Sequence, residues 1–294
     1  MFCLCDMLVS GSRMNKIIIE KEILYKVIKK RVSESNKTNY GRVLLICGSQ
    51  SFGGAAIMAS KAAVYSGAGL VTLASDMINR APFLSSVPEA MFLDYSKKDK
   101  LINSIAKSDV ILLGSGLEDS DFSLNLLETV FNNVKTKHLL VIDGTALSMI
   151  GKNGLKIPKS PTTILTPHQG EWQRVSGLSI PEQIPIENYK KMAELNIDFL
   201  VLKSSATEIY SLKKTEEYSK LNIGGPFQAI GGMGDTLAGL IAGFLGQFKS
   251  DKISVIQAAT YLHSYIAHNL SQKQYVTLPT RISERIPTEM KKII

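Results

Sequence analysis

Asp235 follows a run of glycines and precedes an apolar helical segment, a combination that can support phosphate chemistry. Backbone without side chains lets several N–H groups turn toward one point. A helix that begins there adds free N–H groups and the positive end of its dipole, which favour an anion such as phosphate. A carboxylate at such a site can take a proton from a hydroxyl group. The glycines are Gly224, Gly225, Gly231, Gly232 and Gly234.

A simpler interpretation of the same segment is structural. Asp is a common N-cap residue after a glycine turn, and Asp235 stands where an ordinary N-cap is expected. The number of glycines exceeds what one helix cap requires. The sequence therefore favours an anion site with Asp235 as its reactive side chain.

Glycine or polar turns follow apolar segments at five further places in the chain. They lie at residues 48–55, 114–116, 143, 166–171 and 203. Each is expected at the carboxyl end of a strand, the edge at which open α/β sheets bind their ligands. We therefore expect all five turns and the glycine loop to surround one cleft.

The segments that would carry these turns alternate between apolar strands and helices. Strands are expected at 42–47, 70–74, 90–94, 109–113, 138–143, 162–165 and 199–203, with a strand and a helix within 17–31 and a hairpin within 207–218. Helices are expected at 55–66, 98–106, 121–132, from 145, and at 181–195, 235–247 and 252–271. This order predicts an α/β fold with a mostly parallel central sheet and helices on both faces.

No repeat or linker-like tract interrupts this order, so residues 17–294 are expected to form a single catalytic domain. The chain begins with MFCLCDMLVSGSR, which lacks the basic start of a signal peptide. Residues 1–16 are therefore expected to be a disordered or extension segment.

The composition is that of a globular enzyme, with 45% apolar and 20% charged residues among 294. The net charge of +8 comes from lysines scattered along the chain, which argues against a nucleic-acid surface. Cys3, Cys5 and Cys47 form neither a disulfide framework nor a zinc-binding spacing, so a reducing cytoplasm is expected. The longest apolar run, after Asp235, is interrupted by glycines and is too short to span a membrane.

Six segments together resemble the ADP/ATP-dependent NAD(P)H-hydrate dehydratases, a family within the ribokinase-like superfamily. They are GSQSFGGA, LLGSGL, VIDGTAL, TPHQGE, VLKSSAT and GGPFQAIGGMGDTLAGLIAG. The resemblance extends from about residue 17 to the C-terminus, and its most specific parts are TPHQGE and the block around Asp235. It implies a ribokinase-like fold. Neither the lysine of a Walker A loop nor the G-x-G-x-x-G of dinucleotide-binding folds is present.

The resemblance also implies an activity. Members of this family restore the S form of hydrated NADH or NADPH (NADHX, NADPHX) to the reduced dinucleotide at the expense of ADP, giving AMP and phosphate, or of ATP. The enzyme would be a carbon–oxygen lyase that repairs a damaged cofactor. It would use Mg²⁺ with its nucleotide and form a cytoplasmic homo-oligomer, a tetramer or larger, without nucleic-acid or membrane partners.

By motif match, Asp235 would be the catalytic base. The hydrated dinucleotide would contact Ala55, Gly116, His168 and Asp235. ADP or AMP would contact Lys203, Ser204, Ser205, Ala206, Thr207, Gly231, Gly232 and Gly234. No residue is assigned as a metal ligand, and Asp143 and Glu171 either hold turns or help to organise Mg²⁺ and water. From the local pattern alone, His168 is more simply a turn histidine bound by backbone.

Two departures from the usual sequence of the family concern the nucleotide. The second acid of the family's Asp-Ala-Asp-Ala-Leu is missing from the segment 143–147, and its Lys-Gly-x-x-Thr reads KSSAT at 203–207. Both departures leave Asp235 and the glycine loop intact. They bear on the choice and affinity of the nucleotide more than on the class of reaction.

Two other functions remain open from the sequence. A kinase of the same superfamily, acting on a vitamin precursor or a sugar, would share Asp235 and the glycine loop but would not need TPHQGE. A non-catalytic nucleotide-binding or sensing protein would bind its ligand without turnover, which an intact base at position 235 disfavours. Analysis of the reaction products separates these possibilities.

Overall fold

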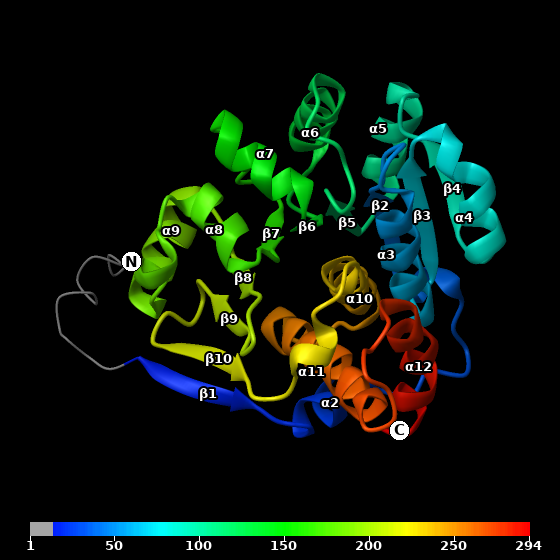
Figure 1. The fold of residues 1–294 in the computed structure, drawn as a ribbon. Helices are drawn as coiled ribbons and strands as arrows, with labels where there is room; N and C mark the ends of the chain where they lie inside the picture. Colours follow the sequence, from blue (N-terminus) through cyan, green and yellow to red (C-terminus); the bar gives the residue numbers. More distant parts are fainter. Residues whose placement is uncertain (1–13) are drawn as a thin grey trace.

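The computed structural model describes residues 14–294, which contain one sheet of ten strands (Figure 1). The strands pair in the order β1-β10-β9-β8-β7-β6-β5-β2-β3-β4. Within this described part, β9 runs antiparallel to β8 and β10, and the other pairs are parallel. The strands are β1 (Asn15–Ile19), β2 (Arg42–Ile46), β3 (Leu70–Ser75), β4 (Met91–Asp94), β5 (Val110–Leu113), β6 (Leu139–Ile142), β7 (Thr162–Leu165), β8 (Phe199–Leu202), β9 (Glu208–Ser211) and β10 (Glu217–Leu221).

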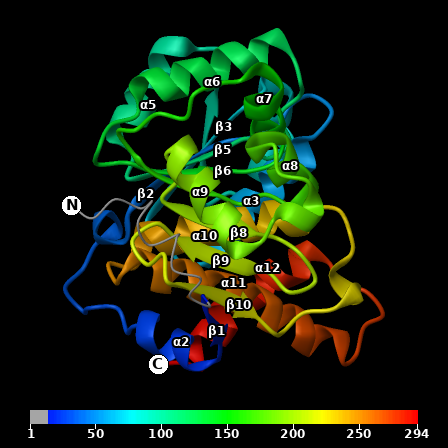
Figure 2. The ribbon, with the colours of Figure 1, turned by 90° about the vertical axis from the view of Figure 1, so that its left-hand side faces the viewer.

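Helices cover both faces of the sheet. Figure 2 shows α5 to α9 on one side and α2, α10, α11 and α12 on the other, where α3 packs against α10. The α-helices are α2 (Glu22–Val27), α3 (Gly53–Tyr65), α4 (Arg80–Ser86), α5 (Lys98–Lys107), α6 (Asp121–Asn133), α7 (Thr145–Asn153), α8 (Gln169–Ser176), α9 (Pro185–Leu195), α10 (Met233–Gln247), α11 (Lys252–Ser271) and α12 (Pro279–Lys291).

The central strands are apolar on both sides because each side faces a layer of helices. In β2, Val43 and Leu45 belong to the core beneath α3 and α10, whereas Leu44 and Ile46 belong to the core beneath α5 to α9. Side chains alternate between the two faces of a strand, so a run of consecutive apolar residues supplies both cores. The predicted mostly parallel sheet with helices on both faces is confirmed.

The order of the central strands brings the predicted turns to one edge of the sheet. β8, β7, β6, β5 and β2 are neighbours and run parallel. The residues that follow them therefore emerge side by side at their carboxyl ends. The expectation that these turns meet at one edge is confirmed.

Several predicted helices differ from the structure. The helix expected at 181–195 is interrupted, because a 3₁₀ turn (Ile180–Glu182) precedes α9, which begins at Pro185. Two short helices, α4 and α8, are not predicted. The domain closes with α12 in addition to the two expected helices. Pro279 begins α12 and Pro287 lies inside it, and proline usually argues against a helix interior.

The first described strand includes Asn15 and Lys16, which are predicted as part of an N-terminal extension. They pair in register with Glu217 and Tyr218 of β10, so these two residues belong to the folded sheet. Met14 is also described, whereas residues 1–13 of the predicted extension lie outside the described residues. Among residues 14–294, no helix combines the length and the apolar character needed to cross a membrane.

The glycines in α10 allow it to lie directly against α3. A Cβ at position 239 would collide with the carbonyl oxygen of Ala59, and one at position 243 would collide with the Ser66 hydroxyl. Both glycines are buried. Backbone thus approaches backbone at this contact, and the start of α10 is fixed relative to the start of α3.

Gly239→Ala should lower the free energy of unfolding by roughly 1–3 kcal/mol, because the added methyl group overpacks a rigid backbone contact. Gly54→Ala in α3 is the matched control, since a Cβ there meets no atom within 4 Å. Alanine is the better helix former, so the control should be neutral or stabilised by up to about 1 kcal/mol. Urea unfolding of both variants checks this, and equal midpoints would contradict it.

Candidate active site

Asp143 lies directly after β6 and is 2% exposed. Its Oδ1 accepts hydrogen bonds from the Thr166 hydroxyl at 2.7 Å and the Lys203 ammonium at 2.8 Å. Its Oδ2 accepts one from the Ser115 hydroxyl at 3.0 Å. These donors lie just beyond β7, β8 and β5. Asp143 therefore joins the ends of four neighbouring strands and uses both of its oxygens to do so.

Asp143 and Lys203 form an ion pair inside the site. Burial alone would raise the pKa of Asp143, but the Lys203 ammonium and the hydrogen bonds hold it below its usual value. Burial would likewise lower the pKa of Lys203, yet that pKa is raised, because Asp143, Glu171 and Asp235 act on it. Both partners are therefore charged at physiological pH.

Asp235 is the third residue of α10, and the N-cap is Gly232. The prediction that Asp235 stands at the N-cap is therefore wrong. Gly232 has a φ of 91°, a left-handed conformation that favours glycine, and so takes that position. Asp235 still lies in the first turn, where N–H groups are free of helical partners.

The environment of Asp235 raises the pKa of its carboxyl group toward physiological pH. Burial raises its pKa to about 6, the nearby Asp143 carboxylate adds to the shift, and the Lys203 ammonium opposes it. A general base is most effective when its pKa lies near the working pH. Asp235 is thus ionised at neutral pH but remains basic enough to accept a proton.

Lys203 reaches α10 beside Gly234. A Cβ at position 234 would lie 3.0 Å from Lys203 Nζ, closer than a normal contact. Glycine at this position therefore leaves room for the ammonium group at the helix N-terminus. A positive side chain and a positive helix end together favour a phosphate group there.

His168 is the N-cap of α8. Its Nδ1 accepts backbone N–H bonds from Gly170 at 3.0 Å and Glu171 at 3.2 Å, and Glu171 Oε2 accepts from the His168 N–H at 2.8 Å. Burial, followed by the charge of Lys203, lowers the pKa of His168. With Nδ1 acting as an acceptor, the neutral ring carries its proton on Nε2. Backbone contacts therefore fix the ring, and its Nε2 lies 3.6 Å from Glu171 Oε1.

Ala55 and Gly116 lie against each other near the start of α3. Gly116 has a φ of +71°, and a Cβ there would lie 2.6 Å from the Ala55 Cβ and 2.7 Å from the Phe52 carbonyl oxygen. The neighbouring Ser115 accepts a backbone hydrogen bond from Gly48 at 2.8 Å. Ala55 and Gly116, two of the predicted dinucleotide contacts, are thus brought together. Gly116 directly follows Ser115, whose hydroxyl donates a hydrogen bond to Asp143.

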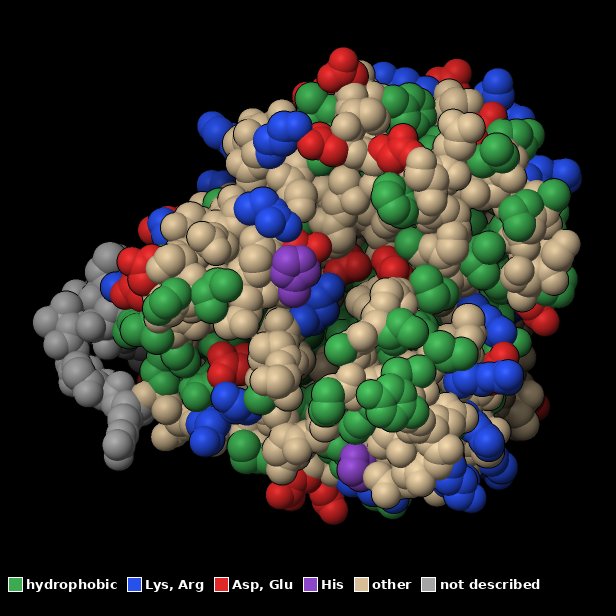
Figure 3. All heavy atoms as spheres, in the orientation of Figure 1, with side chains coloured by type: hydrophobic (Ala, Val, Ile, Leu, Met, Phe, Trp, Pro, Cys, Tyr) green, Lys and Arg blue, Asp and Glu red, His purple; other side chains and the backbone are tan. Residues whose placement is uncertain are grey.

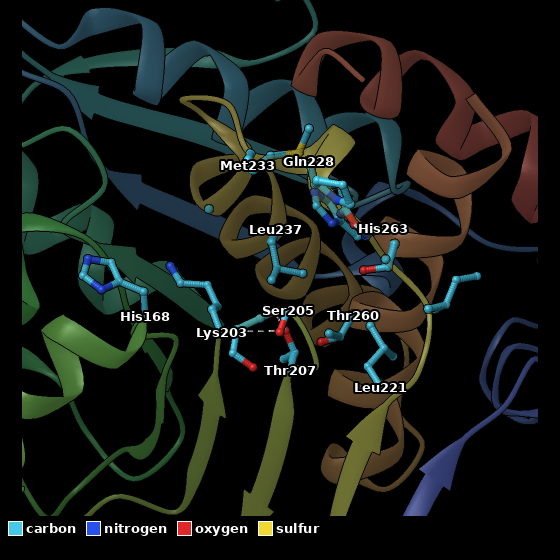
Figure 4. Close-up of a pocket in the computed structure, with 18 residues that line it drawn as sticks. His168, Lys203, Ser205, Thr207, Leu221, Gln228, Met233, Leu237, Thr260 and His263 are labelled. Atoms are coloured by element: carbon cyan, nitrogen blue, oxygen red, sulfur yellow. Dashed lines mark hydrogen bonds between the residues drawn. The ribbon is translucent and has the colours of Figure 1, made fainter. Parts of the chain in front are cut away.

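A cavity of about 630 Å³ opens beside Lys203. In Figure 4, His168 and Lys203 stand on one side of it and His263 on the other. The predicted site residues that line it are His168, Lys203, Ser204, Ser205, Thr207 and Gly234. Ala206, Gly231 and Gly232 do not belong to this lining. On the molecular surface, acidic, basic and histidine side chains meet in a hollow near the middle of the same face (Figure 3).

Comparison with known proteins identifies the family. A family model described as NAD(P)H-hydrate dehydratase matches residues 43–288. A curated relative from Streptococcus thermophilus, named ADP-dependent (S)-NAD(P)H-hydrate dehydratase, is 45% identical over 278 residues, covering 94% of this chain and 99% of the relative. The chain belongs to the NAD(P)H-hydrate dehydratase family.

Two solved structures resemble this NAD(P)H-hydrate dehydratase family member over nearly its whole length. A ribokinase-like superfamily protein from Enterococcus faecalis has a TM-score of 0.90 and 40% identity, covering 95% of this chain and 96% of the other. An ADP/ATP-dependent NAD(P)H-hydrate dehydratase from Bacillus subtilis, co-crystallized with ATP/Mg²⁺, has a TM-score of 0.83 and 25% identity, covering 96% and 100%. The predicted ribokinase-like fold is confirmed.

Part of the cavity in this NAD(P)H-hydrate dehydratase family member comes from residues that no motif indicates. They belong to β10 and to α11, and they include Leu221, Thr260 and His263. In the sequence these positions are ordinary members of apolar strand and helix patterns. Only the packing of α11 against α10 shows that they face a cavity.

Proposed function

We propose that this protein dehydrates the S form of hydrated NADH and NADPH at the expense of ADP, giving AMP and phosphate. The observation that carries the proposal is the position of Asp235, a carboxyl group of raised pKa in the first turn of α10, close to the Lys203 ammonium. ADP is proposed over ATP because the Streptococcus relative is named ADP-dependent. The enzyme is then a carbon–oxygen lyase.

The reaction balances with Asp235 as the base. Asp235 takes the proton of the substrate's 6-hydroxyl group as its oxygen attacks the β-phosphorus of ADP, and the bond from that phosphorus to the leaving AMP breaks. The C6–O bond of the resulting phosphate ester then breaks and releases inorganic phosphate, while C5 loses a proton to water, which restores the C5–C6 double bond. Lys203 and the N-terminus of α10 stabilise the charge on the transferred phosphoryl group.

The two substrates are assigned to two sides of Asp235. The nucleotide would occupy the cavity, with its phosphates toward Lys203, Ser204, Ser205 and Gly234, all of which line the cavity. The hydrated dinucleotide would lie toward Ala55 and Gly116 and would also contact His168. Ala206, Gly231 and Gly232 have weaker support as nucleotide contacts, because they lie outside the lining.

Mg²⁺ is proposed to bind together with the nucleotide. The described residues contain no group of three or more His, Cys, Asp or Glu side chains suited to hold a metal, and the Asp143 oxygens already accept three hydrogen bonds. Mg²⁺ is commonly held by substrate phosphates and water with one or two carboxylates. We therefore assign the ion no ligand from the protein; it would arrive with the nucleotide and offset negative charge on the phosphates.

The test is recovery of reduced-nicotinamide absorbance from hydrated NADH with ADP, with ATP, and with neither. The proposal predicts recovery that requires a nucleotide and releases phosphate. A superfamily kinase would instead accumulate a stable phosphorylated product, and a nucleotide-binding protein without catalysis would show binding but no turnover. No recovery with either nucleotide would overturn the proposal.

The pH profile should report the Asp235 carboxyl group. Its pKa of about 6 predicts that kcat/KM falls about tenfold per pH unit below pH 6, because the protonated acid cannot accept the substrate proton. Above this pH the carboxylate is ionised and the limb should flatten. The limb should persist in His168→Gln and Glu171→Gln, and its disappearance in either variant would assign it to that residue instead.

A cytoplasmic location and a homo-oligomer of four or more subunits are also proposed, on the family resemblance. So is a single catalytic domain, which includes Asn15 and Lys16 of β1 as well as residues 17–294. Light scattering of the purified protein measures the number of subunits directly, and a monomer at micromolar concentration would contradict that part.

A further inference from the structure

β1 is an outer strand of the sheet, next to β10 (Figure 1). The Asn15 N–H donates to the Glu216 carbonyl oxygen at 2.9 Å, so the backbone groups of Asn15 face β10. Backbone N–H and C=O groups point alternately to the two sides of a strand, which turns those of Lys16 and Ile18 outward. Among residues 14–294, no strand pairs with this outward edge. It is therefore a free template for another strand.

The side chains along this edge include exposed isoleucines. Ile17 is 41% exposed and Ile18 is 36% exposed. A hollow of about 290 Å³ lies beside them, between β1, α2 and α11, and Ile19 and Ile23 line it together with polar residues. An apolar edge next to an apolar hollow favours a partner strand that places an apolar side chain there.

Lys16 and Glu20 make this edge complementary to itself. In an antiparallel pair with a two-fold axis at Ile18, Lys16 of each copy lies opposite Glu20 of the other. The outward backbone groups of Ile18 also meet across this axis, as a hydrogen-bonded pair requires.

The charges of Lys16 and Glu20 are available for such a pair. Both side chains are exposed, and neither forms an ion pair within the described part of the chain. Lysine on an edge strand usually discourages pairing, but opposite charges facing each other across two strands stabilise it. β4, the other outer strand, carries Asp94 and no basic residue, so two copies of β4 offer no such pair.

We propose that β1 pairs antiparallel with β1 of a second copy of this chain, about a two-fold axis at Ile18. The two sheets join into one continuous sheet, and Ile17 of each copy enters the hollow beside Ile19 of the other. An interface of this kind uses the same surface on both subunits, as most homodimers do. The inference names a surface for the homo-oligomer proposed above and does not depend on the dehydratase activity.

The test of the charges is sedimentation of the full chain over a range of concentrations. Lys16→Glu should raise the dissociation constant at least about tenfold, because two attractive pairs become repulsive. Glu20→Lys should do the same. The double variant Lys16→Glu/Glu20→Lys restores opposite charges in the same register, so its constant should return to within about threefold of the wild type. Single variants without effect, or a double variant that does not recover, would overturn the inference.

Ile18→Pro tests the backbone pairing. Proline at this position removes an outward N–H, so pairing with β10 is retained while pairing with a second copy is lost. The oligomer should fall to half its mass or less, and a far-UV circular dichroism spectrum like that of the wild type shows that the variant is folded. A folded variant of unchanged mass would contradict the proposal.

Hydrogen exchange of the wild type identifies what occupies the edge. Protection of the β1 amides should rise with protein concentration, because a second copy supplies the pairing strand. Equal protection at all concentrations would place another segment of the same chain on this edge and overturn the inference. A monomer at micromolar concentration would contradict both this inference and the proposed homo-oligomer, whereas an oligomer unaffected by the charge variants would contradict the inference alone. None of these measurements needs turnover, so failure of the dehydratase proposal would appear separately.

Discussion

Asp235→Asn should keep the fold and lose at least about 100-fold in the rate of ADP-dependent dehydration. The amide has the shape of the carboxyl group but cannot take the proton from the substrate hydroxyl, and a general base contributes roughly 10²–10⁴-fold. The measurement is recovery of reduced-nicotinamide absorbance at saturating ADP and hydrated NADH. A variant that retains most of its activity would remove Asp235 from the mechanism.

The stability of the same variant provides its control. The pKa of Asp235 is raised from 3.8 to about 6 in the folded protein. The contribution of this group to stability is therefore fully present below pH 3.8 and is lost as the pH rises through about 6. At pH 8 the ionised carboxylate disfavours the fold, and asparagine removes that charge from beside Asp143. Thermal unfolding at pH 8 should show the variant to be at least as stable as the wild type.

Lys203→Met should destabilise the protein and nearly abolish activity. It leaves the Asp143 carboxylate buried without its cation, and breaking a buried pair in this way costs about 3 kcal/mol or more. It also removes the positive charge next to Gly234, where loss of one such contact to a developing anion costs roughly 10²–10³-fold in rate. Urea unfolding and the dehydratase assay measure the two effects.

The double variant Asp143→Asn/Lys203→Met separates them. The amide introduced at position 143 keeps an oxygen that can accept hydrogen bonds from Thr166 or Ser115 and carries no charge, so most of the lost stability should return. Activity should not return, because no cation faces the phosphate. If activity recovered together with stability, Lys203 would have only a structural role. If stability did not recover, the ion pair would not explain the loss.

The fold could be predicted from the sequence where local pattern and tertiary structure agree. Strands such as β2 and β6 are short apolar runs that end in glycine or aspartate, and packing on both faces requires that pattern. Prediction fails where packing overrides local preference. α12 forms although Pro287 lies within it, because its own residues Ile282 and Ile286 are fully buried. α8 begins at Gln169 after the N-cap His168, whose ring replaces the usual short cap side chain.

The candidate site divides in a similar way. Asp235, Lys203 and His168 follow turns with recognisable glycine or polar residues, so the sequence indicates them. The position of Asp235 within the helix could not be predicted, because glycine and aspartate both serve as N-caps and only the backbone decides between them. His263 gives no signal at all. It lies in the middle of a buried helix, and only the packing of that helix beside β10 and α10 places it in the lining of the cavity.

The close contact between α3 and α10 has a consequence for the genetics of this protein. Every single-base change in a glycine codon that alters the amino acid adds at least a Cβ atom. At positions 239 and 243 that atom meets Ala59 and Ser66, so each such change is expected to cost stability. Single-codon changes at this contact are therefore unfavourable, and the distance between the start of α3, which carries Ala55, and the start of α10, which carries Asp235, is expected to change little. We expect substrate preference to change during evolution through substitutions in the loops, whose residues can be exchanged one codon at a time.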